Sequence, residues 1–176
     1  EIGVGTDHNG IIVLPDDAVV GTPAAEYYHL ESDWVIDIDI TANRADALSH
    51  YGVARDLYAW LVQRGYKTSL HRPDCSKFHV DNEDMPIDVE IENTDACKRY
   101  ACLSITDCEV KESPKWLQDK LTVIGLRPIN NIVDITNYIM MAYGQPMHCF
   151  DADKVTGHKI VVRTQPEGTK FVTLDG

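Results

Sequence analysis

Long apolar runs are missing from this 176-residue sequence, although hydrophobic residues make up 44% of it. A helix needs about 20 predominantly apolar residues to cross a membrane, and no stretch approaches that length. Neither a membrane span nor a secretion signal is predicted. We therefore expect a cytoplasmic globular protein with no membrane partner.

Paired cysteine motifs are also missing. The chain has five cysteines, which is an odd number, and no two of them form a CxxC pair. This spacing argues against a disulfide framework and against a zinc knuckle. We expect reduced thiols, with Cys149 as a packed, unreactive side chain, and no metal site. The cysteines are Cys75, Cys97, Cys102, Cys108 and Cys149.

Positive charge is scarce, since 16 Lys and Arg face 28 Asp and Glu and the net charge is −12. Proteins that bind a nucleic-acid backbone use clustered Lys and Arg. This chain is therefore not expected to be the main nucleic-acid-binding surface. A glycine-rich phosphate loop is absent from the sequence as well, and no nucleotide site is predicted.

The stretch 127–151 is the most informative part of what is present. Apolar residues at three-and-four spacing predict a helix over 131–143, which Gly144 and Pro146 bring to an end. Thr136 lies at the edge of the apolar stripe, and Asn137 lies about 100° further around the helix. His148 follows in a loop that can fold back toward this flank. Such crowding of polar side chains favours a site.

Each polar residue of the stretch also has an ordinary structural explanation. Asn130 or Asn131 is a good N-cap, and Asp134 in the first turn suits the helix dipole. The Thr136 hydroxyl can bond to a carbonyl one turn earlier. Only the combination of these residues favours a functional interpretation.

Elsewhere the patterns alternate between strands and helices. A polar turn containing Arg44 and Asp46, which we expect to brace each other, precedes a second helix. The fold class is α+β, with a mixed sheet and packed helices preceded by a small strand-helix segment. Helices are expected over 50–64 and 113–124, the latter with Ser113 as N-cap, and strands over 11–14, 34–41, 88–92, 100–108, 159–164 and 170–174.

Several motifs in a fixed order resemble the beta subunit of bacterial-type phenylalanyl-tRNA synthetase. INNIVDITNY and GQPMHCFD lie within 127–151, and ITANRADALSHYGVARDL lies upstream at 40–57. The dipeptide Arg99-Tyr100, the segment SPKWL at 113–117 and a GxDHxGIxVLP pattern at 5–15 complete the match. The resemblance covers nearly the whole chain.

The resemblance implies a domain order. Residues 1–24 would be the tail of an OB-like tRNA-binding domain, and residues 25–70 a small strand-helix domain of B1 type. The polar, aperiodic stretch 71–85 is expected to be a linker, and residues 86–176 would be the N-terminal part of a B3/B4-like editing domain. We therefore expect a piece of a longer polypeptide.

The function implied by the resemblance is a contribution to the hydrolytic editing of Tyr-tRNA(Phe), within an enzyme that charges tRNA with phenylalanine using ATP. Carried over residue by residue, the editing pocket would be lined by Arg127, Thr136, Asn137 and His148. His148 and Thr136 would position the attacking water, and Arg127 and Asn137 would bind the substrate. Groups that recognise the tyrosine hydroxyl would lie beyond Gly176, so the isolated chain is expected to be inactive.

The resemblance also implies partners and leaves two alternatives. The partners would be the alpha subunit, in a heterotetramer of two alpha and two beta chains, and the acceptor end of tRNA(Phe). ATP and Mg²⁺ would serve the holoenzyme through the alpha subunit, with no cofactor in this segment. One alternative is a non-catalytic scaffold that supports alpha-subunit and tRNA docking. The other is a metal-dependent hydrolase with His148, Asp151 and Asp153 as ligands.

Overall fold

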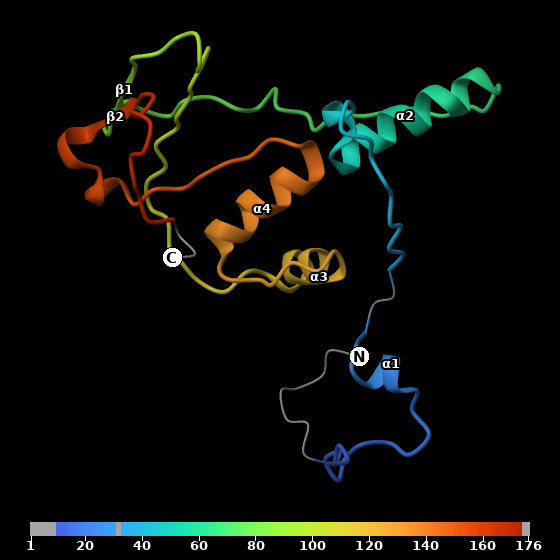
Figure 1. Ribbon diagram of the computed structural model, residues 1–176. Coiled ribbons are helices and arrows are strands. Elements are labelled where there is room, and N and C mark those ends of the chain that lie inside the picture. The colour runs from blue at the N-terminus through green and yellow to red at the C-terminus, as the bar shows by residue number, and fades with distance from the viewer. Residues whose placement is uncertain (1–9, 31–32, 174–176) are drawn as a thin grey trace. The chain divides into compact units, whose positions relative to one another are not determined.

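The computed structural model describes residues 10–30 and 33–173, and the chain divides into two units between Asp39 and Ile40. Helices and a small sheet are both present, so the predicted α+β class is confirmed (Figure 1). The elements are α1 (Ala24–Tyr27), η1 (Ala45–Ala47), α2 (His50–Gln63), β1 (Asp88–Ile91), α3 (Lys115–Val123), α4 (Asn131–Tyr143), η2 (Ala152–Lys154), η3 (Thr156–His158) and β2 (Lys159–Val162).

Helix α2 follows the prediction for 50–64 closely. Ser49 is its N-cap, and the Ser49 hydroxyl accepts a hydrogen bond from the Gly52 amide at 2.9 Å. At the other end Gly65 has a φ of +79°, the left-handed conformation that commonly follows a helix. The helix therefore begins and ends where its local signals place it.

Helix α3 packs against α4 through Leu117 and Leu121, which are both about 1% exposed. The prediction that Ser113 caps α3 is wrong. Pro114 occupies the N-cap position and supplies no capping side chain, while the Ser113 hydroxyl donates to Asp134 instead. The predicted cap fails because the helix begins at Lys115, one residue later than a cap at Ser113 requires.

Helix α4 spans the predicted residues 131–143. The Asn130 side chain accepts hydrogen bonds from the amides of Ile132 and Val133, and Gly144 ends the helix with a φ of +73°. The end of α4 contacts the start of α2, where Nδ1 of His50 lies 3.0 Å from the Met141 carbonyl oxygen. Residues 127–143 are thus held between two other helices.

The sheet consists of β1 and β2, which pair in parallel with Asp88 opposite Lys159. The predictions for 88–92 and 159–164 are confirmed over four residues each. Those for 11–14, 34–41 and 100–108 are wrong, and 170–173 is not a strand either, whereas Leu174 lies outside the described residues. Alternating apolar and polar residues show that an extended segment would have one apolar face. A strand also needs a second strand with which to form backbone hydrogen bonds. Across 10–30 and 33–173 no antiparallel pair forms, so the mixed part of the predicted sheet is missing.

Little apolar surface is buried in the described part of the chain. The buried hydrophobic residues are Ala47, Leu117 and Leu121, while Trp34 is 92% exposed and Phe171 is 79% exposed. No helix in the described ranges is long and apolar enough to cross a membrane. The predicted domain boundaries at 24, 70 and 85 stay predictions, and residues 1–9 of the first of those domains lie outside the described part.

Candidate functional site

Polar residues at the start of α4 bind backbone groups of the preceding segment. The Asn131 amide group donates to the Glu109 carbonyl at 2.9 Å, and its side-chain oxygen accepts from the Lys111 amide at 3.1 Å. The Asn131 backbone amide also donates to the Lys111 carbonyl at 2.8 Å. Asn131 therefore fastens segment 109–111 to the helix, and it is not available to a substrate.

Asp134, like Asn131, bonds to residues outside α4, but its side chain is completely buried. One carboxylate oxygen accepts from the Ser113 hydroxyl at 2.5 Å, and the other accepts from the Ile129 amide at 2.9 Å. In the first turn of α4, Asp134 has the position expected for a residue that interacts with the helix dipole. Its hydrogen bonds to Ser113 and Ile129 were not predicted from the sequence. Asp134 joins the entry to α3, the segment before α4, and α4 itself.

Thr136 and Asn137 lie on α4, two and three residues after Asp134, and both are half-buried. The Thr136 hydroxyl donates to the Val133 carbonyl at 2.7 Å, as the ordinary structural explanation expected. Its oxygen lone pairs are left to accept a hydrogen bond. The Asn137 side chain makes no hydrogen bond with any residue in 10–30 or 33–173, so its two donors and its acceptor are open to a ligand.

His148 and Arg127 lie on either side of α4 in the sequence, and both are exposed. The His148 ring packs on Phe150 with 4.6 Å between ring centroids and an angle of 59° between the planes. Arg127 lies in the segment that joins α3 to α4, and it forms no ion pair within the described ranges. The four predicted site residues thus belong to one helix and to the two segments that flank it.

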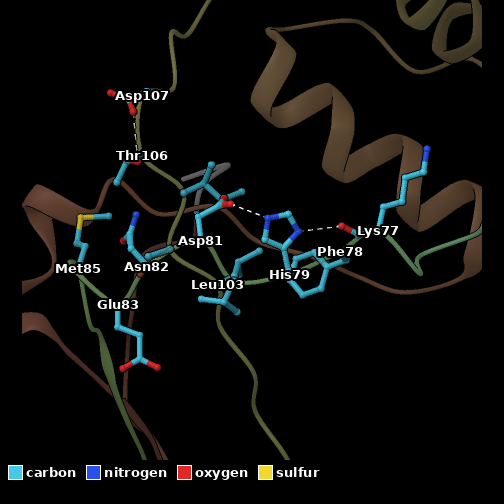
Figure 2. Close-up of a pocket in the computed structure, with 13 residues that line it drawn as sticks. Lys77, Phe78, His79, Asp81, Asn82, Glu83, Met85, Leu103, Thr106 and Asp107 are labelled. Atoms are coloured by element: carbon cyan, nitrogen blue, oxygen red, sulfur yellow. Dashed lines mark hydrogen bonds and ion pairs between the residues drawn. The ribbon is translucent and has the colours of Figure 1, made fainter.

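Two hollows of the described residues lie away from these four residues. A hollow of about 520 Å³ is lined by residues of 77–85, in the region expected to be a linker, and of 103–107 (Figure 2). There His79 lies between Asp81, at 3.0 Å, and the Lys77 carbonyl, also at 3.0 Å. A second hollow lies on α2 beside Trp60 and Arg64. Neither of these two hollows contains a predicted site residue.

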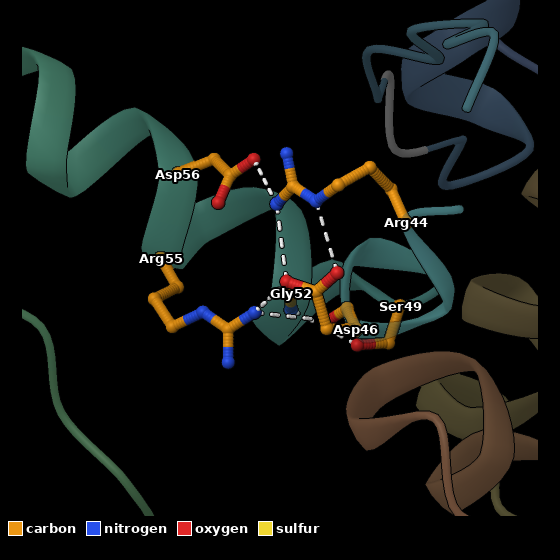
Figure 3. A network of polar contacts seen from close by, with 6 residues as sticks. All are labelled: Arg44, Asp46, Ser49, Gly52, Arg55 and Asp56. Atoms are coloured by element: carbon orange, nitrogen blue, oxygen red, sulfur yellow. Dashed lines mark hydrogen bonds and ion pairs between the residues drawn. The ribbon is translucent and has the colours of Figure 1, made fainter. Parts of the chain in front are cut away.

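A network of charges braces η1 against α2, as expected for Arg44 and Asp46 (Figure 3). Nε of Arg44 donates to Asp46 at 2.9 Å, and its Nη2 donates to Asp56 at 2.6 Å, while Arg55 also pairs with Asp46. The hydrogen bond from Arg44 holds the pKa of Asp46 below its usual value. The same bond from Arg44 to Asp46 raises the arginine pKa. The network is half-exposed, and its groups satisfy one another.

The described residues do not support the metal-dependent alternative. Asp151 accepts from the Asp153 amide at 3.3 Å and pairs with Lys154 at 3.1 Å. In the part of the chain that the structure describes, no three His, Cys, Asp or Glu side chains gather to hold a metal ion. The prediction that Cys149 is packed is wrong, because this thiol is exposed in the loop after α4.

Comparisons with known proteins show what this sequence is similar to. The model of the B3/4 domain matches residues 96–176, a range that contains Arg127, Thr136, Asn137 and His148. Over all 176 residues the chain is 62% identical to the phenylalanine-tRNA ligase beta subunit of Bacteroides fragilis. The corresponding figures are 55% for Porphyromonas gingivalis and 43% for Dehalococcoides mccartyi. The chain is thus similar over its whole length to part of these phenylalanine-tRNA ligase beta subunits.

The phenylalanine-tRNA ligase beta subunits that it matches are much longer proteins. The chain spans about a fifth of their length, 22% of the Bacteroides fragilis protein and 21% of the other two. The match to the B3/4 domain begins after β1 and includes α3, α4 and β2. All the residues predicted for an editing pocket fall on the B3/4 side of the chain.

Proposed function

We propose that this chain contributes to the hydrolytic editing of Tyr-tRNA(Phe), as part of an enzyme that uses ATP to charge tRNA with phenylalanine. The observation that carries the proposal is that the whole of this chain matches part of phenylalanine-tRNA ligase beta subunits, together with the B3/4 match over 96–176. His148 and Thr136 are the proposed catalytic residues. Arg127 and Asn137 are the proposed substrate-binding residues.

Hydrolysis of an aminoacyl ester needs an oriented water, donors for the developing oxyanion, and contacts that hold the terminal ribose. Because the Thr136 hydroxyl already donates to Val133, Thr136 acts as an acceptor toward water or a ribose hydroxyl. The Asn137 amide has open donors for the oxyanion. The His148 imidazole orients or deprotonates the water.

The remaining chemistry of the proposed enzyme belongs to other parts of the assembly. The alpha subunit, in a heterotetramer of two alpha and two beta chains, would use ATP and Mg²⁺ for charging in the cytoplasm. With a net charge of −12, this segment receives a tRNA acceptor end that other surfaces deliver. The exposed Arg127 supplies a local positive charge for the ribose-phosphate.

The test uses the assembled alpha and beta subunits. His148→Ala and Thr136→Ala are compared with wild type for hydrolysis of tyrosine attached to tRNA(Phe), and charging with phenylalanine is followed in parallel. We expect hydrolysis to fall about 100-fold for His148→Ala, the usual contribution of a positioned general base, with charging intact. His71→Ala, which changes an exposed histidine outside the B3/4 range, is the control. Unchanged hydrolysis in both variants would leave this segment as a docking scaffold.

A further inference from the structure

The segment between α3 and α4 is held at both ends. After α3, Gly125 has a φ of +82°, and the Leu126 amide donates back to the Leu121 carbonyl at 2.9 Å. Before α4, the Ile129 amide donates to Asp134 at 2.9 Å. Arg127 and Pro128 are the residues between these two fixed amides. The side chain of Arg127 is exposed. Its backbone has little freedom, because the amides on both sides of it are bonded.

Pro128 restricts the segment further. Its ring fixes its own φ, and it excludes Arg127 from the helical region. With the amides of Leu126 and Ile129 bonded, few backbone arrangements remain for Arg127. Removing one of the two hydrogen bonds would release the segment at that end, whereas the proline restriction alone leaves several extended conformations open.

Asp134 is the residue that links this segment to the proposed site. It lies two residues before Thr136 and three before Asn137 on the same rigid helix. Its carboxylate is completely buried and makes no ion pair within the described ranges. Burying a charge is costly unless it is well hydrogen-bonded, and the bonds here go to Ser113 and Ile129. A plain helix-packing position would be filled at lower cost by an apolar side chain.

We propose that Asp134 is a positioning residue that fixes Arg127 relative to Thr136 and Asn137. This inference rests on the proposed editing function. Asp134 touches no substrate and acts through the Ile129 amide and the short segment beyond it. The consequence is that Asp134 affects substrate binding by Arg127, while phenylalanine charging does not depend on it.

A double-mutant cycle in the assembled alpha and beta subunits tests this. Asp134→Ala, Arg127→Ala and the double variant are assayed for Tyr-tRNA(Phe) hydrolysis, with kcat and KM separated. We expect Asp134→Ala to lower kcat/KM about tenfold, mainly through KM, since a small misplacement can cost up to 100-fold. The double variant should match Arg127→Ala alone, because residues that act through one another are not additive.

Two further variants sharpen the cycle. Asp134→Asn keeps an acceptor for the Ile129 amide and can donate to the Ser113 oxygen, so it should assemble normally and retain hydrolysis. Asp119→Ala removes an exposed carboxylate on α3 that pairs with Lys115, and it should change nothing. Because Asp134→Asn preserves the shape of the site, a loss of hydrolysis in this variant with charging intact would contradict the inference even where Asp134→Ala does not fold.

Several outcomes would overturn the inference. Losses that multiply in the double variant would mean that Asp134 and Arg127 act independently. A parallel loss of phenylalanine charging would mean that Asp134 supports the whole subunit. Loss of hydrolysis with Asp134→Asn would mean that the carboxylate charge itself is required. If His148→Ala abolishes hydrolysis and Asp134→Ala does not, the editing proposal stands and this inference alone fails.

Discussion

Side chains of the same type serve different purposes within a few residues of α4. Asn130 caps the helix and Asn131 binds segment 109–111, whereas the Asn137 side chain has no hydrogen bond within the described ranges. The sequence predicted polar crowding but could not separate these roles. The contacts that decide the role of Asn131 go to Glu109 and Lys111, which are about 20 residues away in the chain. Only the resemblance selected Asn137, and local pattern gave no reason to prefer it.

The charge network around Asp46 predicts a measurable pH dependence. Because Arg44 lowers the pKa of Asp46 below 3.8 in the folded chain, the network stabilises the fold above that pH. The stabilisation is lost as the pH falls through the lowered pKa. Carbon-13 NMR of the Asp46 carboxyl should show titration below 3.8, and Arg44→Gln should move the pKa upward. Arg64→Gln, on the far end of α2, should leave it unchanged. Titration of wild-type Asp46 at or above 3.8 would contradict the expected contact.

At the scale of elements, helices were predicted well and strands poorly. The signals for α2 and α4 are local, since Ser49, Gly65, Asn130 and Gly144 act within one turn of the helix they begin or end. A strand depends on a partner that can be far away in the sequence. The alternation in 34–41 therefore predicted a strand that the structure does not form, while β1 and β2 do find each other.

The packing of η1 on α2 predicts that a methyl group added at Gly52 strongly destabilises the fold. A Cβ at Gly52 would lie 2.5 Å from the Asp46 carbonyl oxygen and 2.7 Å from the Ala47 Cα, so Gly52→Ala must separate the two elements. We expect a loss of about 3 kcal/mol in the free energy of unfolding, the upper part of the range for overpacking. Chemical denaturation measures this loss.

Gly65→Ala is the matched control for Gly52→Ala. A Cβ at Gly65 meets nothing within 4 Å, but the φ of +79° strains any other residue. Its cost should be about 1 kcal/mol, from backbone strain alone. Equal losses for the two variants would show that η1 is not packed against the helix as described.

At the scale of the whole molecule, the chain has a small buried core and a surplus of acidic charge. Three buried apolar residues in the described part contrast with fully or largely exposed ones such as Val20 and Trp34. Composition predicted the charge but could not reveal the missing burial, because 44% hydrophobic residues are normal for a globular domain.

The small core predicts that the isolated chain lacks activity. The 176-residue chain should show no hydrolysis of Tyr-tRNA(Phe) above the rate without protein, and it should bind a fluorescent apolar dye such as ANS. The assembled alpha and beta subunits, measured under the same conditions, should hydrolyse the ester and bind less dye per chain. Hydrolysis by the isolated chain at the rate of the assembly would show that the four predicted residues suffice.

The parallel pairing of β1 with β2 has a consequence for the order of events during synthesis. Asn93 and Thr164, which follow the two strands and are joined by a hydrogen bond, are 71 residues apart. At a ribosomal rate of 5–20 residues per second, β1 waits roughly 4 to 14 seconds for its partner. Helices α3 and α4 are both synthesised within that interval. They contact each other and are close in the sequence, so they can pack without waiting for β2. The helical pair that carries Thr136 and Asn137 is therefore complete before the sheet can close.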